Sequence, residues 1–381
     1  MVVKTITPPV EKAVPTVSTS QEVITRMIDD REVRGHLHSN GGGFVAETAH
    51  VEETAFVGEN AMVLDRASVS GKARVYDNAR VFGLAEVSGD AKVFDRAEVF
   101  GEARVYDNAK VYGNADVYGH AKVYDNAQVL GDASICFHAQ VYGNARVFGF
   151  ADVDGYAEVF GDAKVFGNAK VFGNAKVYGE AAVDGKAEVD GYAEVFGDAK
   201  VFGDARVTGS AFVSGSAFVY GSAFVFGDAR VTGSAFVFGS AKVYGKAEVS
   251  GGARVFGDAE VFGDARVYGK AKVSGKAEIG TGSFTSMSIT SNEGAQLYLK
   301  TMEYLETKLE EMQETSSAHQ VMNETLSPRG SKGKIYEQNY GSAIQAPKKF
   351  VRPFHQQQKD SEEFDETLSP RGPAKKMTKK K

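Results

Sequence analysis

Apolar residues recur along the chain with a strict period of six. An aliphatic residue, nearly always Val, falls at every sixth position from Val45 to Ile279 without insertion or deletion, and Ala stands two positions before almost every one. Residues two apart in an extended backbone face the same side, so Ala and Val point inward together and the residue between them faces solvent. Gly followed by Asn or Asp then supplies a turn, because Gly accepts a positive φ and Asn and Asp form local hydrogen bonds. Each hexad therefore predicts one short strand and one corner.

A unit of six residues cannot bury its own apolar side, so the hexads have to stack into a solenoid with a continuous core of Ala and Val. Val165 to Lys170, with the sequence VFGNAK, shows an aliphatic residue, three variable residues, a small residue and one more variable residue. In this order the chain resembles the hexapeptide-repeat left-handed parallel β-helix superfamily, which includes acyltransferase-like proteins of bacteria and phages.

The resemblance implies an all-β fold, a single-stranded left-handed parallel β-helix in which three hexads make one coil. The repeat then forms about 13 coils, and stacked strands about 4.8 Å apart give a rod on the order of 60 Å long. Members of this superfamily are commonly trimers with parallel rods. The resemblance therefore also implies a homo-oligomer, with a homotrimer as the expected form.

Both ends of the chain depart from the repeat, which divides the protein into four segments. We expect residues 1–20 to be disordered and residues 21–34 to cap the first coil, because solenoids need polar caps for solubility. The predicted segments are 1–43 for the disordered N-terminus and cap, 44–282 for the β-helix, 283–314 for a terminal strand and helix, and 315–381 for a disordered tail.

Residues 292–314 show the spacing of a helix. Tyr298, Met302, Leu305, Leu309 and Met312 are alternately four and three residues apart. This spacing fits a short coiled-coil seam, and it fits equally a helix that packs on the last coil.

The tail contains the motif ETLSPRG twice, at 324–330 and at 366–372. A linear motif repeated in a polar tail suggests a docking peptide for a protein partner, or phosphorylation of its serines. The residues concerned are Ser327, Pro328, Arg329, Ser369, Pro370 and Arg371.

Composition narrows the classes of function. The formal net charge of −6 gives no support for nucleic-acid binding, and a single cysteine, Cys136, excludes an internal disulfide. The N-terminus has no apolar core of signal-peptide length, and the chain has no run of about 18 apolar residues. We therefore expect no membrane span and a cytoplasmic location, and no motif in the sequence calls for a cofactor.

Aligning every third hexad separates three faces, of which one is basic and aromatic. On the face through Val57, Val75 and Val93, the residues just before the core position include no acid, and most residues just after it are aromatic. We expect this face to be covered by self-association or by an anionic or sugar-like polymer, unless its rings form ladders that stabilise the solenoid itself. The predicted interaction residues are Arg74, Tyr76, Lys92, Phe94, Lys110, Tyr112, Arg146, Phe148, Lys164, Phe166, Lys200 and Phe202.

One hexad, within GDASICFHAQVYGN at 131–144, breaks the pattern. Cys136 and Phe137 replace an aromatic residue and the turn Gly, and His120, His138 and Tyr156 follow one another at intervals of 18. Two stacked imidazoles could hold a metal or act as acid and base, with the carboxylates of Asp116, Asp152 and Asp154 on the same face.

The family gives that hexad a possible role. Hexapeptide acyltransferases use a His base at a subunit interface, and γ-class carbonic anhydrases hold zinc with three His across one. Such enzymes usually build the pocket from a projecting loop, and this array has no insertion. We therefore expect His120 and His138 to be corner residues rather than catalytic or metal-binding ones.

Together these patterns favour a non-enzymatic structural scaffold or spacer rod. Such a rod self-associates through the basic and aromatic face and recruits a partner through its tail. One alternative is an acyl-CoA-dependent acyltransferase-like enzyme. Another is a polymer-forming cytoskeletal or phage structural protein.

Overall fold

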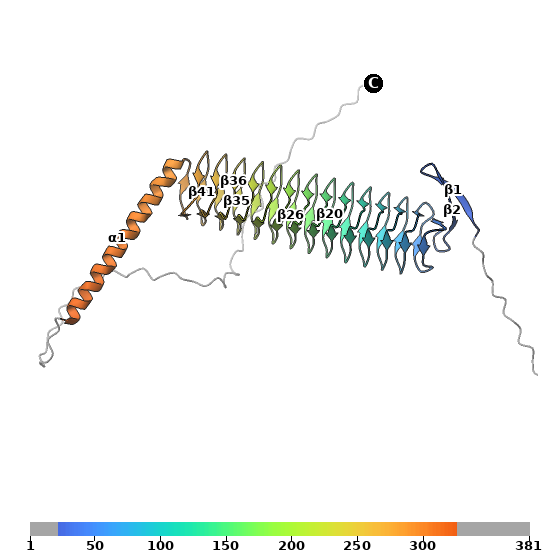
Figure 1. The fold of residues 1–381 in the computed structure, drawn as a ribbon, viewed down its shortest axis with the longest axis horizontal. Helices are drawn as coiled ribbons and strands as arrows, with labels where there is room; N and C mark the ends of the chain where they lie inside the picture. Colours follow the sequence, from blue (N-terminus) through green and yellow to red (C-terminus); the bar gives the residue numbers. More distant parts are fainter. Residues whose placement is uncertain (1–21, 326–381) are drawn as a thin grey trace, which may run out of the picture. The chain divides into compact units, whose positions relative to one another are not determined.

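The computed structural model describes residues 22–325, and its main body is a parallel β-solenoid of 14 turns (Figure 1). The chain divides into two units, Met1–Ser316 and Ser317–Lys381. The first unit contains the whole solenoid. Of the second unit, only residues 317–325 are described, as the last part of a helix. The tail residues Ser327, Pro328, Arg329, Ser369, Pro370 and Arg371 therefore lie outside the described part of the chain.

The strands are as short as the hexad predicts. Each strand from β4 (His50–Val51) to β42 (Glu278–Ile279) consists of one core aliphatic residue and the residue before it, and successive strands start six residues apart. β3 (Phe44–Ala46) is one residue longer. The alternation of a buried residue with an outward one follows from the two-residue period of extended backbone.

Three parallel sheets form the sides of the solenoid, and each is named here by its first solenoid strand. The β3 sheet contains every third strand from β3 to β42, the β4 sheet those from β4 to β43, and the β5 sheet those from β5 (Phe56–Val57) to β44. Between β3 and β42, each strand residue pairs with the residue 18 positions away in the same sheet, as Val93 does with Val111, and the separation falls to 17 and 16 for β43 and β44. The 18-residue register predicted from the sequence is therefore confirmed.

The core consists of Ala and Val from every turn. The repeat residues at these positions are buried throughout the array and form one continuous cluster from Val45 to Ala295. Main-chain hydrogen bonds join the coils: Lys92 N donates to Ala109 O at 2.9 Å, and Phe94 N donates to Val111 O at 3.0 Å. Each coil thus buries its apolar side on its neighbours and shares its polar backbone with them.

The corners require a left-handed backbone. Most carry Gly with a φ near +70°, and the coils stack so closely there that a Cβ on Gly119 would lie 2.9 Å from Phe137 N. Asp replaces Gly at several corners, and its carboxylate then accepts a hydrogen bond from the next coil, as Asp125 Oδ2 does from Gly143 N at 3.1 Å. Phe137 adopts the same conformation, with a φ of 54°, while its side chain is 60% exposed. This residue bears the cost of a left-handed backbone without a polar group that bonds locally.

A β-hairpin closes the N-terminal end. β1 (Ile24–Ile28) and β2 (Arg31–Leu37) pair antiparallel, and β2 pairs antiparallel with β3. Phe44 lies fully buried in the small apolar cluster between the hairpin and the first coils. A cap stands where the sequence predicts one, and it is built of strands that run through Leu37.

At the other end, the spacing of core residues shrinks from six to five, through Phe284 in β43 (Ser283–Phe284) and Ile289 in β44 (Ser288–Ile289). The helix α1 (Asn292–Thr325) follows, and the ring of its Tyr298 lies 5.4 Å from that of Phe284. The helix runs past residue 314, so residues 315–325 are helical and the predicted start of a disordered tail at 315 is wrong. Within residues 22–325, no helix has the length and apolar character that a membrane crossing would require.

Replacing Phe137 with Gly tests the account of the corners. We expect Phe137→Gly to raise the free energy of unfolding by about 1 kcal/mol, because Gly removes the left-handed strain of a residue with a Cβ. The measurement is the midpoint of urea unfolding. Asp125→Gly is the matched control at another left-handed corner, and it should lower the midpoint because it removes the carboxylate bonded to Gly143. A lower midpoint for Phe137→Gly would contradict the account.

Candidate functional site

Ion pairs between neighbouring coils occur on two of the three sheets. On the β3 and β4 sheets, outward side chains meet opposite charges one coil away: Arg206 Nε lies 3.0 Å from Glu188 Oε2, and Arg104 Nε lies 3.3 Å from Glu86 Oε2. The full set of such pairs is Arg80–Glu98, Arg104–Glu86, Lys176–Glu158, Arg206–Glu188, Lys242–Glu260 and Arg266–Glu248. These two sheets therefore carry charges of both signs, and part of their charge is paired within the chain, although like charges also meet, as Arg104 and Lys122 do.

The outward row of the β5 sheet carries positive charge alone. Its cations are Arg74, Lys92, Lys110, Arg146, Lys164, Lys200, Arg254 and Lys272. Across the described residues, no salt bridge joins a cation of this row to a carboxylate. Lys92 and Lys110 stand in direct register on adjacent strands, so like charges lie one strand spacing apart. This row is the one strongly charged surface of a single sign among the three sheets of residues 22–325.

The aromatic residues beside this row stack on one another. Tyr76, Phe94 and Tyr112 form one ladder, with ring centroids 4.9 and 4.7 Å apart, and Phe148 and Phe166 form another at 4.8 Å. These rings are half-buried, and their faces cover each other. Phe202 begins a third ladder, which continues through Tyr220, Phe238 and Phe256. The structure thus brings the predicted basic and aromatic residues together, with the rings turned toward each other.

Four cations of the row also lie against aromatic rings, among them Arg146, whose guanidinium stands 5.4 Å from the ring centre of Phe148. The guanidinium of Arg74 stands 4.6 Å from the ring centre of Phe56, and that of Arg254 stands 5.3 Å from the ring centre of Phe236. Lys200 Nζ lies 5.4 Å from the ring centre of Phe218. Such contacts hold the side chains in place and leave their charge uncompensated.

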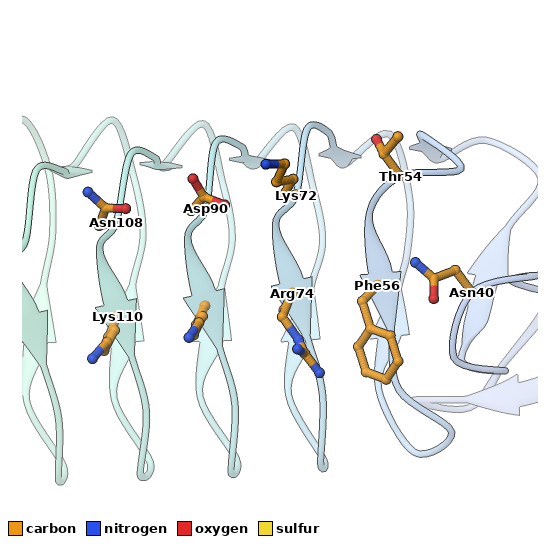
Figure 2. A pocket seen from close by; sticks show the side chains of 9 residues that line it. Asn40, Thr54, Phe56, Lys72, Arg74, Asp90, Asn108 and Lys110 are labelled. Atoms are coloured by element: carbon orange, nitrogen blue, oxygen red, sulfur yellow. The ribbon is translucent and has the colours of Figure 1, made fainter.

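A hollow of about 560 Å³ opens on the N-terminal coils of the β5 sheet (Figure 2). Figure 2 shows two parallel rows of side chains along it, one along the strands and one along the preceding corner. The strand row is Phe56, Arg74, Lys92 and Lys110, and the corner row is Thr54, Lys72, Asp90 and Asn108, with Asn40 at the end. The lining combines four cations with one carboxylate and several neutral hydrogen-bonding groups.

His120 and His138 form a column with Tyr156 at an exposed corner. The rings of His120 and His138 stack at 4.8 Å, and those of His138 and Tyr156 at 4.7 Å. His120 Nδ1 lies 3.2 Å from Glu102 Oε2. The predicted stacking of the two histidines is confirmed, and His138 has both ring faces covered, one by His120 and the other by Tyr156. Asp152 and Asp154 lie close to Cys136 instead.

Cys136 forms a small group with two carboxylates. Its sulfur and one carboxylate oxygen each of Asp152 and Asp154 all lie within 4.8 Å of one another. The ring ladder of Phe82, Phe100 and Tyr118 ends just before this group, because Cys136 and then Asp154 occupy the next places in the column. A hollow of about 150 Å³ lies beside them, lined by Asp152, Asp154, Lys170 and Phe172. Aligning every third hexad places Cys136 and Asp154 at one corner, so their proximity could have been predicted from the sequence.

The environment of this group favours the protonated forms of Cys136 and Asp152. The Cys136 thiol is buried, and burial raises its pKa, while hydrogen bonds with Tyr118 and Ser134 act in the opposite direction. Burial, and then the charge of Asp154, raise the pKa of Asp152. A thiolate and carboxylates are ligands that zinc accepts, but a cation at this site would first have to displace the thiol proton. The arrangement fits a hydrogen-bonded network that fills a gap in the ring ladder.

Comparison with known families agrees with the fold. A family model described as the YdcK beta solenoid repeat matches residues 139–150. No curated protein matches the chain. The match and the 14-turn solenoid identify a β-solenoid repeat protein. The finer resemblance to the hexapeptide superfamily, with its winding hand, its trimers and its acyltransferases, stays a prediction.

Removing the half-buried charge of Asp152 should stabilise the protein at neutral pH. A carboxyl whose pKa is raised by folding stabilises the fold while it is protonated, and that contribution is lost as the pH rises through its folded pKa. We expect Asp152→Asn to match the wild type near pH 3 and to melt about 2 °C higher at pH 7, which is the scale of a change below 1 kcal/mol.

Differential scanning calorimetry between pH 3 and pH 7 measures this difference. Asp204→Asn, at an exposed corner, is the matched control and should leave the melting temperature unchanged at both ends of the range. A melting temperature for Asp152→Asn that falls below the wild-type value as the pH rises would show that the carboxylate stabilises the fold.

Proposed function

We propose that this protein is a non-enzymatic scaffold rod. The observation that carries the proposal is the unbroken repeat between Val45 and Ile279, which places surface side chains in straight rows and makes no projecting loop. Rows of identical spacing suit contacts with an extended or repeated partner, whereas a catalytic site needs a single enclosed pocket. The fold thus supports a role in which length and regularity matter more than one reactive group.

The surroundings of the two histidines support the same proposal. His120 is engaged with Glu102, and His138 lies between the rings of His120 and Tyr156. A general base acts on a substrate that a pocket holds in place, whereas all three rings of this column stand on an exposed corner. An acyltransferase role therefore has no observation in its favour beyond the resemblance of the repeat.

Self-association of the rod is best supported at α1. The rings of the β5 sheet cover one another and need no partner, whereas α1 carries exposed apolar side chains. Ala295, Tyr298 and Leu299 pack on the last coil, but Met302 is 36% exposed and Leu305 is 47% exposed. These two residues continue the alternating spacing of four and three that a coiled-coil seam requires. A second copy of the same helix is the occupant that this spacing fits.

The mass of the full chain in solution tests the rod and its seam. We expect an oligomer at micromolar concentration, and a monomer when Met302→Glu and Leu305→Glu place carboxylates in the seam. Sedimentation velocity measures both. The matched control is Lys300→Glu with Thr307→Glu, two changes away from the seam on the same helix, and it should keep the wild-type mass.

Two results would contradict this assignment. An oligomer that survives the seam variant would place the interface elsewhere, with the basic face predicted from the sequence as the next surface to change. A wild-type chain that stays monomeric at these concentrations would remove self-association from the proposal.

A further inference from the structure

The outward charges of the β5 sheet are all positive, whereas the β3 and β4 sheets carry charges of both signs. The six ion pairs of Lys or Arg with Glu between neighbouring coils lie on the β3 and β4 sheets, and the outward cations of the β5 sheet have none within the described residues. Like charges stacked directly opposite each other in a sheet destabilise it. The outward cations of the β5 sheet repel one another over many coils. This row is therefore complementary to a partner whose negative charges have a similar spacing.

The hollow on the N-terminal coils has a counterpart that shows how unusual its charge is. Another hollow, of about 450 Å³, lies on the β4 sheet between the same kinds of strand and corner rows. Its lining is balanced, with three cations and three carboxylates: Asp228, Arg230, Lys246, Glu248, Asp264 and Arg266. The hollow on the β5 sheet has Lys72, Arg74, Lys92 and Lys110 against Asp90 alone. The geometry is shared, and the excess of positive charge is particular to the β5 sheet.

The other groups in the hollow indicate the chemistry of the polymer. Single-stranded nucleic acids bind proteins largely by stacking bases on aromatic faces, and the rings beside this row have their faces covered by each other. Asp90 repels any anionic group placed against it but accepts hydrogen bonds from hydroxyl groups, as the neutral side chains of Thr54 and Asn108 also do, and a phosphate chain without hydroxyls offers it no such donor. The lining therefore suits a polymer that carries both anionic groups and hydroxyls.

We propose that the hollow on the N-terminal coils of the β5 sheet binds a linear acidic polysaccharide. Carboxylates of the polymer meet Lys72, Lys92 and Lys110, and its hydroxyls meet Asp90 and the corner row (Figure 2). Contacts with exposed lysines are individually weak, so binding depends on several charges that act together. It therefore falls steeply as salt rises.

Binding of the full chain to polygalacturonate tests the proposal, with neutral dextran as the blank. We expect saturable binding in 50 mM salt, at least tenfold weaker affinity for the variant Lys72→Gln with Lys110→Gln, and no more than twofold loss for Lys246→Gln with Arg266→Gln. The second variant removes the same charge from the balanced hollow. Circular dichroism checks that both variants keep their strand content. An equal loss of affinity in the two variants would show that binding depends only on the net charge of the protein, and it would overturn the proposed site.

Asp90→Ala separates polysaccharide from phosphate polymers. Loss of a hydroxyl acceptor should weaken polygalacturonate binding about threefold or more, whereas loss of a repelling carboxylate would strengthen binding of inorganic polyphosphate or single-stranded DNA. The proposal is overturned if either of those polymers binds the wild type more tightly than polygalacturonate does at equal salt, or if Asp90→Ala binds polygalacturonate more tightly than the wild type. None of these residues lies on α1, so the monomeric seam variant should bind as the wild type does.

Discussion

The stacking of every residue on its counterpart 18 positions along the chain is the constraint on which the rest of this structure depends. Three hexads return the backbone to the same sheet, and the pairing of residues such as Val93 with Val111 fixes the register. The core, the corner glycines and the ring ladders all follow from it. Because each coil repeats the backbone of the last, a side chain is favourable here only when it tolerates a similar neighbour about 4.8 Å away.

Apolar and aromatic residues meet that requirement easily, and charged residues do not. Buried Ala and Val pack on themselves, and stacked rings gain from parallel contact. The β3 and β4 sheets mix charges of both signs, so that neighbours such as Glu86 and Arg104 attract, although like charges also meet there, as Arg104 and Lys122 do. The β5 sheet keeps one sign, so its charge has no structural explanation within residues 22–325, and a functional one is needed.

Most of the fold could be predicted from the sequence, because the period of six determines which residues are buried and how the coils align. The number of turns came out one higher, since Phe284 and Ile289 continue the core at a spacing of five that the strict period does not include. The position of the N-terminal cap could be predicted, but its secondary structure could not. The cap is a hairpin because β2 pairs with β3, and the repeat pattern gives no information on that pairing. The stacking of His120 and His138 followed from their spacing. The spacing of 18 places Cys136 and Asp154 in one column, but the approach of Asp152 to them depends on how its side chain turns, which spacing alone does not give.

The register itself can be measured directly by a distance between two spin labels. Asn108 and Ser216 occupy the same exposed corner six coils apart, since six full turns of three hexads separate them along the chain. With Cys136 replaced by Ser and cysteines placed at 108 and 216, double electron–electron resonance should give one narrow distance of about 29 Å. A broad distribution, or a mean well away from that value, would contradict the 18-residue register and every surface derived from it.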